Sequence, residues 1–190
     1  MGISLAKGGK INLSKDFGVG AGGLSNLQVG LGWDTNRYDG GHEFDLDASV
    51  FLQNDLGKCR SDSDFVFYGN KSGGNGGVIH SGDNKTGDGH GDDEVIDINL
   101  AVLPADVTRI SFTVTIHEAD LRGQNFGQVS NAYVRIVDKA TGTELVRYDL
   151  EEDFSIENAI VVGELYNKGG EWLLLLVSRL KNTKKTKRTK

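Results

Sequence analysis

The chain has 190 residues, enough for one domain with a buried core, and its 27 acidic residues outnumber its 21 basic residues. Apolar residues make up 37% of the sequence, and no apolar run approaches the roughly 20 residues of a membrane-spanning helix. A single cysteine, Cys59, excludes an internal disulfide and a cysteine-based zinc site.

The N-terminus lacks the charged region and long apolar stretch of a secretory signal peptide, so we expect a cytoplasmic protein. Seven of the basic residues fall within the last twelve positions, where there is no acid. The rest of the chain therefore carries 14 basic and 27 acidic residues, a balance that attracts cations and repels nucleic acid. We predict a domain over residues 1–178 and a disordered basic tail over residues 179–190.

Alternation of apolar and polar residues indicates about nine β-strands separated by turns rich in Gly, Asn and Asp. In chain order the predicted strands are Leu27–Trp33, Phe44–Leu52, Asp64–Tyr68, Glu94–Leu100, Ile110–Ile116, Ala132–Val137, Leu145–Leu150, Ile160–Tyr166 and Trp172–Val177. Short helical turns are predicted at Leu103–Val107 and Phe154–Asn158. The chain has 27 glycines and one proline, a composition that suits many tight turns between strands. The fold class predicted is all-β, a sandwich of two sheets with long loops rich in Gly and Asp.

Two glycine-rich segments interrupt the strand pattern. Gly18–Gly23 has no charge and is interpreted as a flexible connection. Gly69–Gly91 contains nine glycines in 23 residues, which we interpret as too many for a packed element. Such a loop is either disordered or held by a ligand.

The end of that second segment carries the strongest functional pattern, an acidic loop from Asp83 to Glu94. Crowded carboxylates repel one another, and a hard divalent cation relieves the repulsion by accepting several oxygen ligands. Lys85 and Gly87 occupy the third and fifth ligand positions of an EF-hand loop, and Asp88 replaces its glycine, so the loop is not an EF-hand. A solvated acidic turn without metal is the alternative interpretation.

A second acidic pair, Asp45 and Asp47, falls in a predicted strand, where both side chains point to one face about 7 Å apart. Further acids stand at strand ends: Asp34 follows one strand, and Glu118 and Asp120 follow another. Loops at one end of a sandwich can converge, so these three are candidate metal ligands of second rank. The alternative for Asp45 and Asp47 is a pair of solvent-facing acids on an outer strand.

Several ordered motifs resemble the TerD family: Gly30-Leu31-Gly32-Trp33-Asp34, Phe44-Asp45-Leu46-Asp47-Ala48-Ser49, the segment Gly82–Glu94, Phe126-Gly127-Gln128-Val129 and Gly163-Glu164-Leu165-Tyr166. The resemblance covers Gly2 to Trp172. It implies a β-sandwich that binds Ca²⁺ at acidic loops, is encoded with bacterial tellurite-resistance and stress-response genes, and has no established catalysis. By motif position it implies these metal-site residues: Asp45, Asp47, Asp83, Asn84, Asp88, Asp92, Asp93 and Glu94. After Trp172 the sequence departs from the family pattern with a leucine-rich run and the basic tail.

The function predicted is therefore a non-enzymatic Ca²⁺-binding module, a scaffold or sensor whose loops are ordered by calcium. Its expected partners are calcium ions and other proteins of a tellurium-resistance or stress complex, with the membrane as one place for that complex. The alternative is a sandwich that binds carbohydrate or a lipid headgroup through Ca²⁺, with Tyr38 and Tyr68 as the aromatic residues nearest the acidic loops. Histidine spacing gives no transition-metal motif, and no nucleophile motif for an enzyme occurs.

Overall fold

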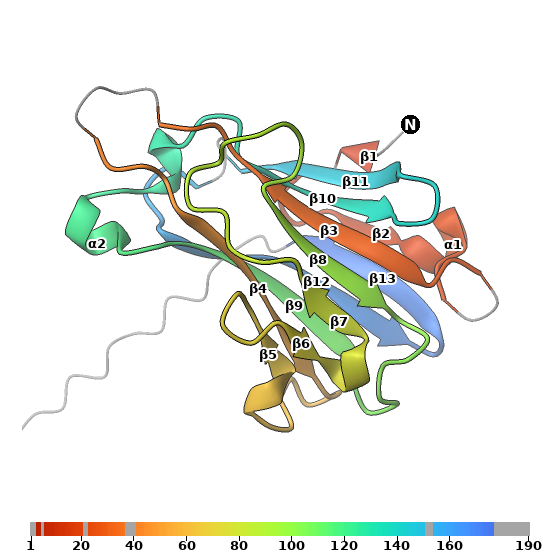
Figure 1. Ribbon diagram of the computed structural model, residues 1–190. Coiled ribbons are helices and arrows are strands. Elements are labelled where there is room, and N and C mark those ends of the chain that lie inside the picture. Colours follow the sequence, from red (N-terminus) through yellow and green to blue (C-terminus); the bar gives the residue numbers. More distant parts are fainter. Residues whose placement is uncertain (1–2, 5, 21–22, 37–40, 151–153, 177–190) are drawn as a thin grey trace, which may run out of the picture.

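The computed structural model describes residues 3–4, 6–20, 23–36, 41–150 and 154–176. Its strands form two sheets that pack face to face (Figure 1). Within the described ranges, one sheet has the order β1-β11-β10-β3-β8-β7-β6 and the other the order β2-β13-β12-β9-β4-β5. Neighbouring strands are antiparallel except for the pair of β1 and β11. The predicted β-sandwich is confirmed.

The bounds of the elements are as follows. The strands are β1 (Ile3–Ser4), β2 (Lys10–Asn12), β3 (Asn26–Gly32), β4 (Leu46–Gln53), β5 (Phe65–Val66), β6 (Ser72–Gly73), β7 (Val78–His80), β8 (Glu94–Asn99), β9 (Arg109–Ile116), β10 (Tyr133–Asp138), β11 (Thr143–Asp149), β12 (Ala159–Lys168) and β13 (Glu171–Leu176). The helices are α1 (Leu13–Phe17) and α2 (Ala119–Arg122), with 3₁₀ turns η1 (Asp62–Asp64), η2 (Gly74–Gly76) and η3 (Phe126–Gln128).

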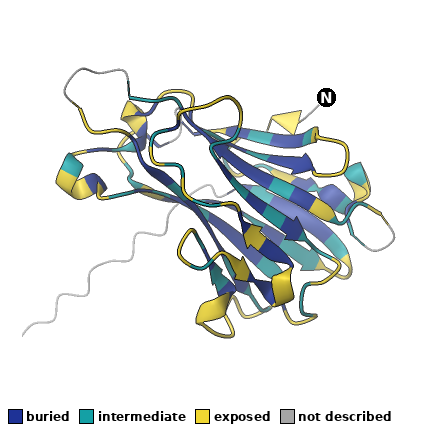
Figure 2. Cartoon of the chain, viewed as in Figure 1, coloured by how far each residue is buried: buried dark blue, intermediate teal, exposed yellow. Residues whose placement is uncertain are grey.

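The core lies between the sheets and is built by the alternation seen in the sequence (Figure 2). In β4, Leu46, Val50 and Leu52 are fully buried, and their cross-strand neighbours in β9 are buried as well. Burying one such side chain contributes about 1.5–3 kcal/mol. The nine predicted strands correspond to β3, β4, β5 and β8–β13, with ends that differ by at most two residues. These packed strands fix the positions from which the acidic loops project.

The prediction that Gly69–Gly91 contains no packed element is wrong. The segment includes β6, η2 and β7, and β7 pairs with β8. Gly73 serves close packing in this segment, because a Cβ atom there would lie 2.6 Å from Val66 Cγ2. For Gly18–Gly23, residues 21 and 22 lie outside the described ranges.

The predicted helical turns are also wrong. Leu103–Val107 forms a turn closed by a hydrogen bond from Val107 N to Pro104 O, and Phe154–Asn158 is irregular. Helix α1 instead begins where the Asn12 side chain accepts a hydrogen bond from Lys15 N and ends at Gly18, which is left-handed with φ 71°. None of the helices that the structure describes has the length and apolar character needed to cross a membrane.

The leucine-rich segment after Trp172 continues β13, which lies between β12 and β2. Trp172, Leu174 and Leu176 are buried in the core. This departure from the family pattern therefore still forms a packed strand as far as residue 176. The predicted domain boundary at residue 178 and the tail over residues 179–190 lie outside the described ranges.

Candidate metal centre

Asp45 and Asp47 lie at the start of β4, at one end of the sandwich. Backbone pairing of Leu46 with Ile116 fixes this end of the strand against β9, and His117 N donates to Asp45 O at 2.8 Å. Asp45 is buried, with 8% of its surface exposed, and Asp47 is half-buried. The sequence therefore folds so that two neighbouring acids lose most of their solvent.

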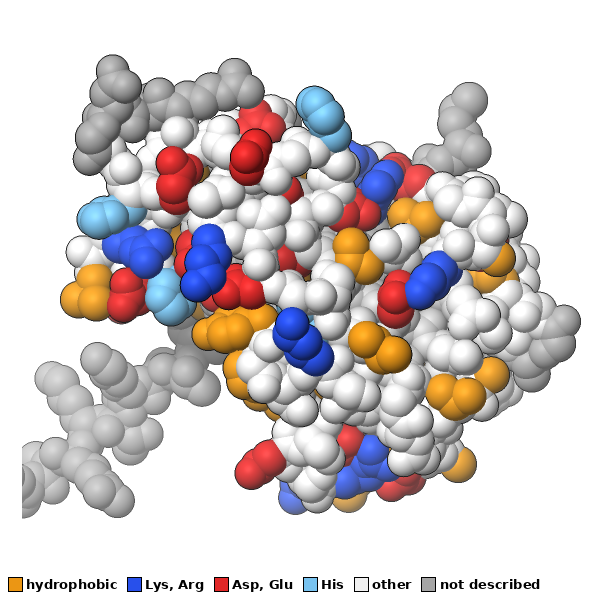
Figure 3. Space-filling view, viewed as in Figure 1, with side chains coloured by type: hydrophobic (Ala, Val, Ile, Leu, Met, Phe, Trp, Pro, Cys, Tyr) orange, Lys and Arg blue, Asp and Glu red, His pale blue; other side chains and the backbone are white. Residues whose placement is uncertain are grey.

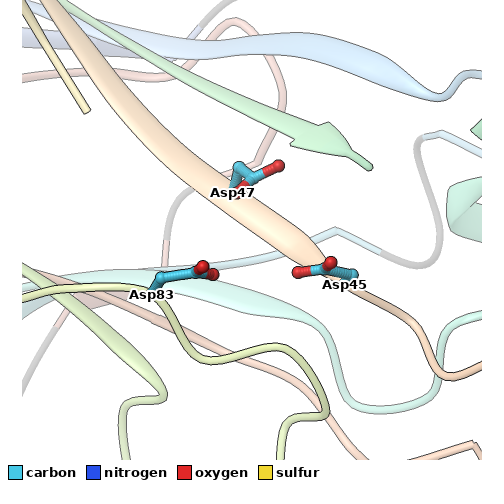
Figure 4. Close-up of side chains that lie close together, drawn as sticks. All are labelled: Asp45, Asp47 and Asp83. Atoms are coloured by element: carbon cyan, nitrogen blue, oxygen red, sulfur yellow. The ribbon is translucent and has the colours of Figure 1, made fainter. Parts of the chain in front are cut away.

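A third acid comes from the loop that follows β7. Asp83 reaches Asp45 and Asp47 so that one carboxylate oxygen of each residue lies within 4.8 Å of the other two (Figure 4). Asp83 itself is exposed, and Lys85 Nζ lies 3.6 Å from its Oδ2 atom. Two segments separated in sequence thus converge on one group of carboxylates, which we call the three-aspartate group.

The electrostatics of the three-aspartate group are unfavourable without a counter-charge. Burial raises the pKa of Asp45, and the charge of Asp83 raises it further. Burial, together with the charges of Glu94, Asp45 and Asp83, raises the pKa of Asp47 to about 7. Ionisation of these carboxylates near neutral pH therefore destabilises the folded protein.

One oxygen of the three-aspartate group has no hydrogen-bond donor among the described residues. Asp45 Oδ1 is buried and accepts no hydrogen bond from any residue that the structure describes. A buried oxygen without a donor costs free energy, unless an ion or water satisfies it. Three converging carboxylates with one unpartnered oxygen fit a hard, oxygen-preferring cation such as Ca²⁺.

The rest of the acidic loop is held by its own hydrogen bonds. Asn84 Oδ1 accepts from the N–H groups of Thr86 and Gly87, and Asn84 Nδ2 donates to Asp93 Oδ1 at 3.1 Å. Asp93 Oδ2 in turn accepts from Trp33 N at 2.9 Å. These contacts hold the loop against the end of β3, so Asn84 and Asp93 shape the loop that presents Asp83.

Gly87 is one position where this loop requires glycine. Its φ is 66°, and a Cβ atom there would lie 2.5 Å from Trp33 Nε1. The Trp33 indole is itself fixed, because Nε1 donates to Phe44 O at 2.9 Å. The loop thus packs directly on the Trp33 side chain, which holds the backbone of Phe44, the residue before Asp45.

Glu94 is fully buried at the start of β8 and lies beside the three-aspartate group rather than in it. Its Oε2 atom accepts from Ala48 N at 2.7 Å, and its Oε1 atom accepts from Asn84 N at 3.4 Å. His80 Nε2 lies 3.6 Å from Glu94 Oε2 and 3.0 Å from Ala48 O. Because Gly82 N donates to His80 Nδ1, a neutral imidazole donates from Nε2 to Ala48 O.

The predicted ligand set does not include His80, which ties the start of the acidic loop to β4. The signal for it was the alternation of Val78 and His80 around exposed Ile79, which is that of a half-buried strand. These residues fall within Gly69–Gly91, where the glycine content predicts an unpacked loop and so obscures the alternation.

Asp92 makes a different set of contacts. Arg135 donates to both of its carboxylate oxygens, at 2.8 and 3.1 Å, and Tyr133 donates to Oδ1 at 3.0 Å. Gly30 makes room for this ion pair, since a Cβ atom there would lie 2.1 Å from Asp92 Oδ2. Asp92 thus has an arginine as its counter-charge.

The remaining predicted ligands do not join the three-aspartate group. Asp88 is exposed in the loop. Asp34 Oδ2 accepts from Asn131 Nδ2, and Glu118 Oε2 pairs with Arg122 at 3.1 Å. Asp120 Oδ1 accepts from Asn158 Nδ2 at 2.7 Å. Each of these last three acids has a protein partner of its own.

Comparison with known proteins identifies the family of the domain. The sequence profile of the TerD domain matches residues 1–179. The chain belongs to the TerD family. The profile spans the whole described sandwich and leaves residues 180–190 outside it.

Relatives within the TerD family include stress and tellurium-resistance proteins. General stress protein 16U of Bacillus subtilis is 62% identical over 172 residues, covering 90% of this chain and 87% of that protein. Tellurium resistance protein TerD of Serratia marcescens is 52% identical, covering 90% of this chain and 87% of that protein. The crystal structure of a TerD homologue from Streptomyces coelicolor superposes with a TM-score of 0.68 at 25% identity, covering 83% of this chain and 90% of that one.

Proposed function

We propose that this TerD domain is a non-enzymatic Ca²⁺-binding module of a bacterial stress-response or tellurium-resistance system. The observation that carries the proposal is the three-aspartate group, whose carboxylate oxygens converge within 4.8 Å while Asp45 Oδ1 has no donor among the described residues. The names of the relatives support the stress and resistance context.

In this proposal Asp45, Asp47 and Asp83 hold the cation. Ca²⁺ takes six to eight oxygen ligands, so carboxylates that bind through one or both oxygens leave further positions open. Mg²⁺ demands a rigid octahedron and keeps its own water, whereas the ligands here come from a strand and a separate loop. The site is therefore expected to prefer Ca²⁺.

The remaining acidic-loop residues support the site. Asn84, Asp93 and Glu94 hold the loop through the hydrogen bonds described above, and a cation bound to Asp83 would tie that loop to β4. Calcium would thus order the loop end of the sandwich and create a docking surface there. This is the scaffold or sensor role that we propose.

Isothermal titration calorimetry of the purified protein tests the proposal, with Ca²⁺, Mg²⁺ and Zn²⁺ titrated in separate experiments. We expect binding heat for Ca²⁺, little for Mg²⁺, and loss of Ca²⁺ binding in the Asp45→Asn/Asp47→Asn variant. Asparagine keeps an oxygen and the side-chain volume but removes the charge.

The matched control is Asp55→Asn/Asp62→Asn, which removes two exposed acids from the segment that follows β4, at the opposite end of that strand. It should bind Ca²⁺ as the wild type does. Equal binding of Mg²⁺ and Ca²⁺, or wild-type affinity in the Asp45/Asp47 variant, would contradict the proposal.

A further inference from the structure

The two most exposed large hydrophobic side chains of the described residues lie on neighbouring segments. Leu121 in α2 is 84% exposed, and Ile156, in the segment between β11 and β12, is 82% exposed. A hydrogen bond of 2.7 Å from Asn158 Nδ2 to Asp120 Oδ1 joins the two segments. Neither side chain has a packing role that would explain an aliphatic residue there.

Both segments border the three-aspartate group. Asp45 O accepts from His117 N, two residues before α2 begins, and Asn158 O accepts from Ile116 N at 2.9 Å. Ile116 is the cross-strand partner of Leu46, which lies between Asp45 and Asp47. Figure 3 shows hydrophobic side chains beside acidic, basic and histidine side chains on the edge where Figure 1 places α2. The exposed side chains of Leu121 and Ile156, which we call the aliphatic tips, therefore share one end of the sandwich with the three-aspartate group.

From this juxtaposition we infer that this end docks on an anionic phospholipid surface when Ca²⁺ is bound, with Leu121 and Ile156 inserted among the lipids and the cation bridging to lipid phosphate. The inference rests on the proposed function, because the bridge requires the cation. Three aspartates leave coordination positions that phosphate oxygens can fill. Asp45 Oδ1, buried and unpartnered among the described residues, is an independent sign of a ligand at this group.

The chemistry of this end favours a lipid surface over a protein partner. Leu121 and Ile156 are single aliphatic side chains set among charged residues such as Glu118 and Asp120. Stable protein interfaces instead present a contiguous patch of about 800 Å² per partner with aromatic anchors at its centre. Isolated aliphatic tips suit the boundary between headgroups and acyl chains, where they can insert separately.

The basic tail adds charge complementarity. Strand β13 runs toward this end of the sandwich. Its last residue, Leu176, pairs with Gly163 in β12. Strand β12 begins nearer this end, at Ala159, which pairs with Thr115, the cross-strand partner of Asp47. The 14 residues beyond Leu176 contain seven Lys or Arg residues and no acid. Fully extended they span about 46 Å, enough to reach a membrane that contacts the loops. Each such cation near an anionic leaflet adds attraction.

The net negative charge of the chain outside the basic tail makes the docking dependent on calcium. Without the cation, the uncompensated carboxylates of this end repel anionic headgroups, against the attraction of the tail. Binding Ca²⁺ removes that repulsion and supplies the bridge. Calcium therefore acts as the switch, while the tail and the aliphatic tips supply affinity.

Vesicle co-sedimentation of the full chain tests the inference, using phosphatidylcholine vesicles with and without phosphatidylserine, in Ca²⁺, Mg²⁺ or EDTA. We expect sedimentation only with phosphatidylserine and Ca²⁺. The Leu121→Gln/Ile156→Gln variant should bind vesicles more weakly by about tenfold for each side chain removed, while its calorimetric Ca²⁺ affinity stays unchanged. Glutamine preserves helix propensity at Leu121 and keeps a side chain of similar size at both exposed positions.

The matched control is Leu56→Gln/Ile79→Gln, which removes two aliphatic side chains that are 74% and 50% exposed on other elements. It should bind vesicles as the wild type does. A protein that binds Ca²⁺ in calorimetry but not vesicles overturns the inference and leaves the proposed function intact, whereas absence of Ca²⁺ heat overturns both. Equal binding in EDTA, equal binding to pure phosphatidylcholine, or no effect of the Leu121/Ile156 change also overturns it.

Discussion

Replacing Asp47 with asparagine should stabilise the metal-free protein, although it removes a charged residue from the surface of β4. Burial and three neighbouring carboxylates raise the pKa of Asp47 from 3.8 to about 7. In the unfolded chain the same group ionises at its ordinary value. Above neutral pH, folding must therefore bring a charged carboxylate into a site that disfavours it, and asparagine avoids that cost.

The magnitude follows from the difference in pKa between the two states. A pKa that rises from 3.8 to about 7 corresponds to about 4 kcal/mol. Because Asp47 is only half-buried, solvent screening reduces the expected effect to about 1–2 kcal/mol. The folded-state pKa is raised, so the unfolded chain binds fewer protons between the two values, and the stability of the wild type falls as pH rises through this window. The advantage of the variant should thus be absent below about pH 4 and complete above about pH 7.

Urea unfolding in EDTA, followed by circular dichroism at about pH 4 and about pH 8, measures this difference. Calcium should reverse the order at the higher pH, because a ligand at 100 times its Kd stabilises the wild type by about 2.7 kcal/mol. An Asp47→Asn protein that is less stable than the wild type in EDTA at the higher pH would refute the reasoning. So would an advantage of equal size at both pH values.

Three other substitutions separate the supporting contacts from the ligands. His80→Leu should lower the free energy of unfolding by about 2–4 kcal/mol in chemical denaturation, because the buried Ala48 O and the partly buried Gly82 N lose their partner. A change within error would contradict this role of His80. Gly30→Ala should cost about 1–3 kcal/mol by thermal unfolding, since the new methyl group displaces the Asp92 carboxylate, and a neutral result would count against that contact. Asp92→Asn should lower the melting temperature by weakening the pair with Arg135, at a cost of about 1–3 kcal/mol, yet keep the Ca²⁺ heat of the wild type; loss of that heat would make Asp92 a ligand instead.

Local patterns were sufficient to predict the strands that build the core. In β4 and β9, alternate apolar residues identify both the strand and its inward face, because side chains of a strand point to opposite sides with a period of two. The same logic failed for β7, where nearby glycines suggested an unpacked loop. Glycine has no side chain, so it suits both mobile loops and backbones that pack closely, and only the neighbours at Gly73 distinguish the two uses.

The amino-acid order alone places acids in two clusters, one in a glycine-rich loop and one in the strand at Asp45 and Asp47. Which of these acids meet in space depends on the folded arrangement of the strands. Asp83 approaches the strand pair, whereas Asp92, nine residues later, meets Arg135, because β10 pairs with β3 and places Arg135 opposite Gly30. A carboxylate's role depends on the charges that surround it in space, and those charges come from strands whose pairing is a long-range property of the fold.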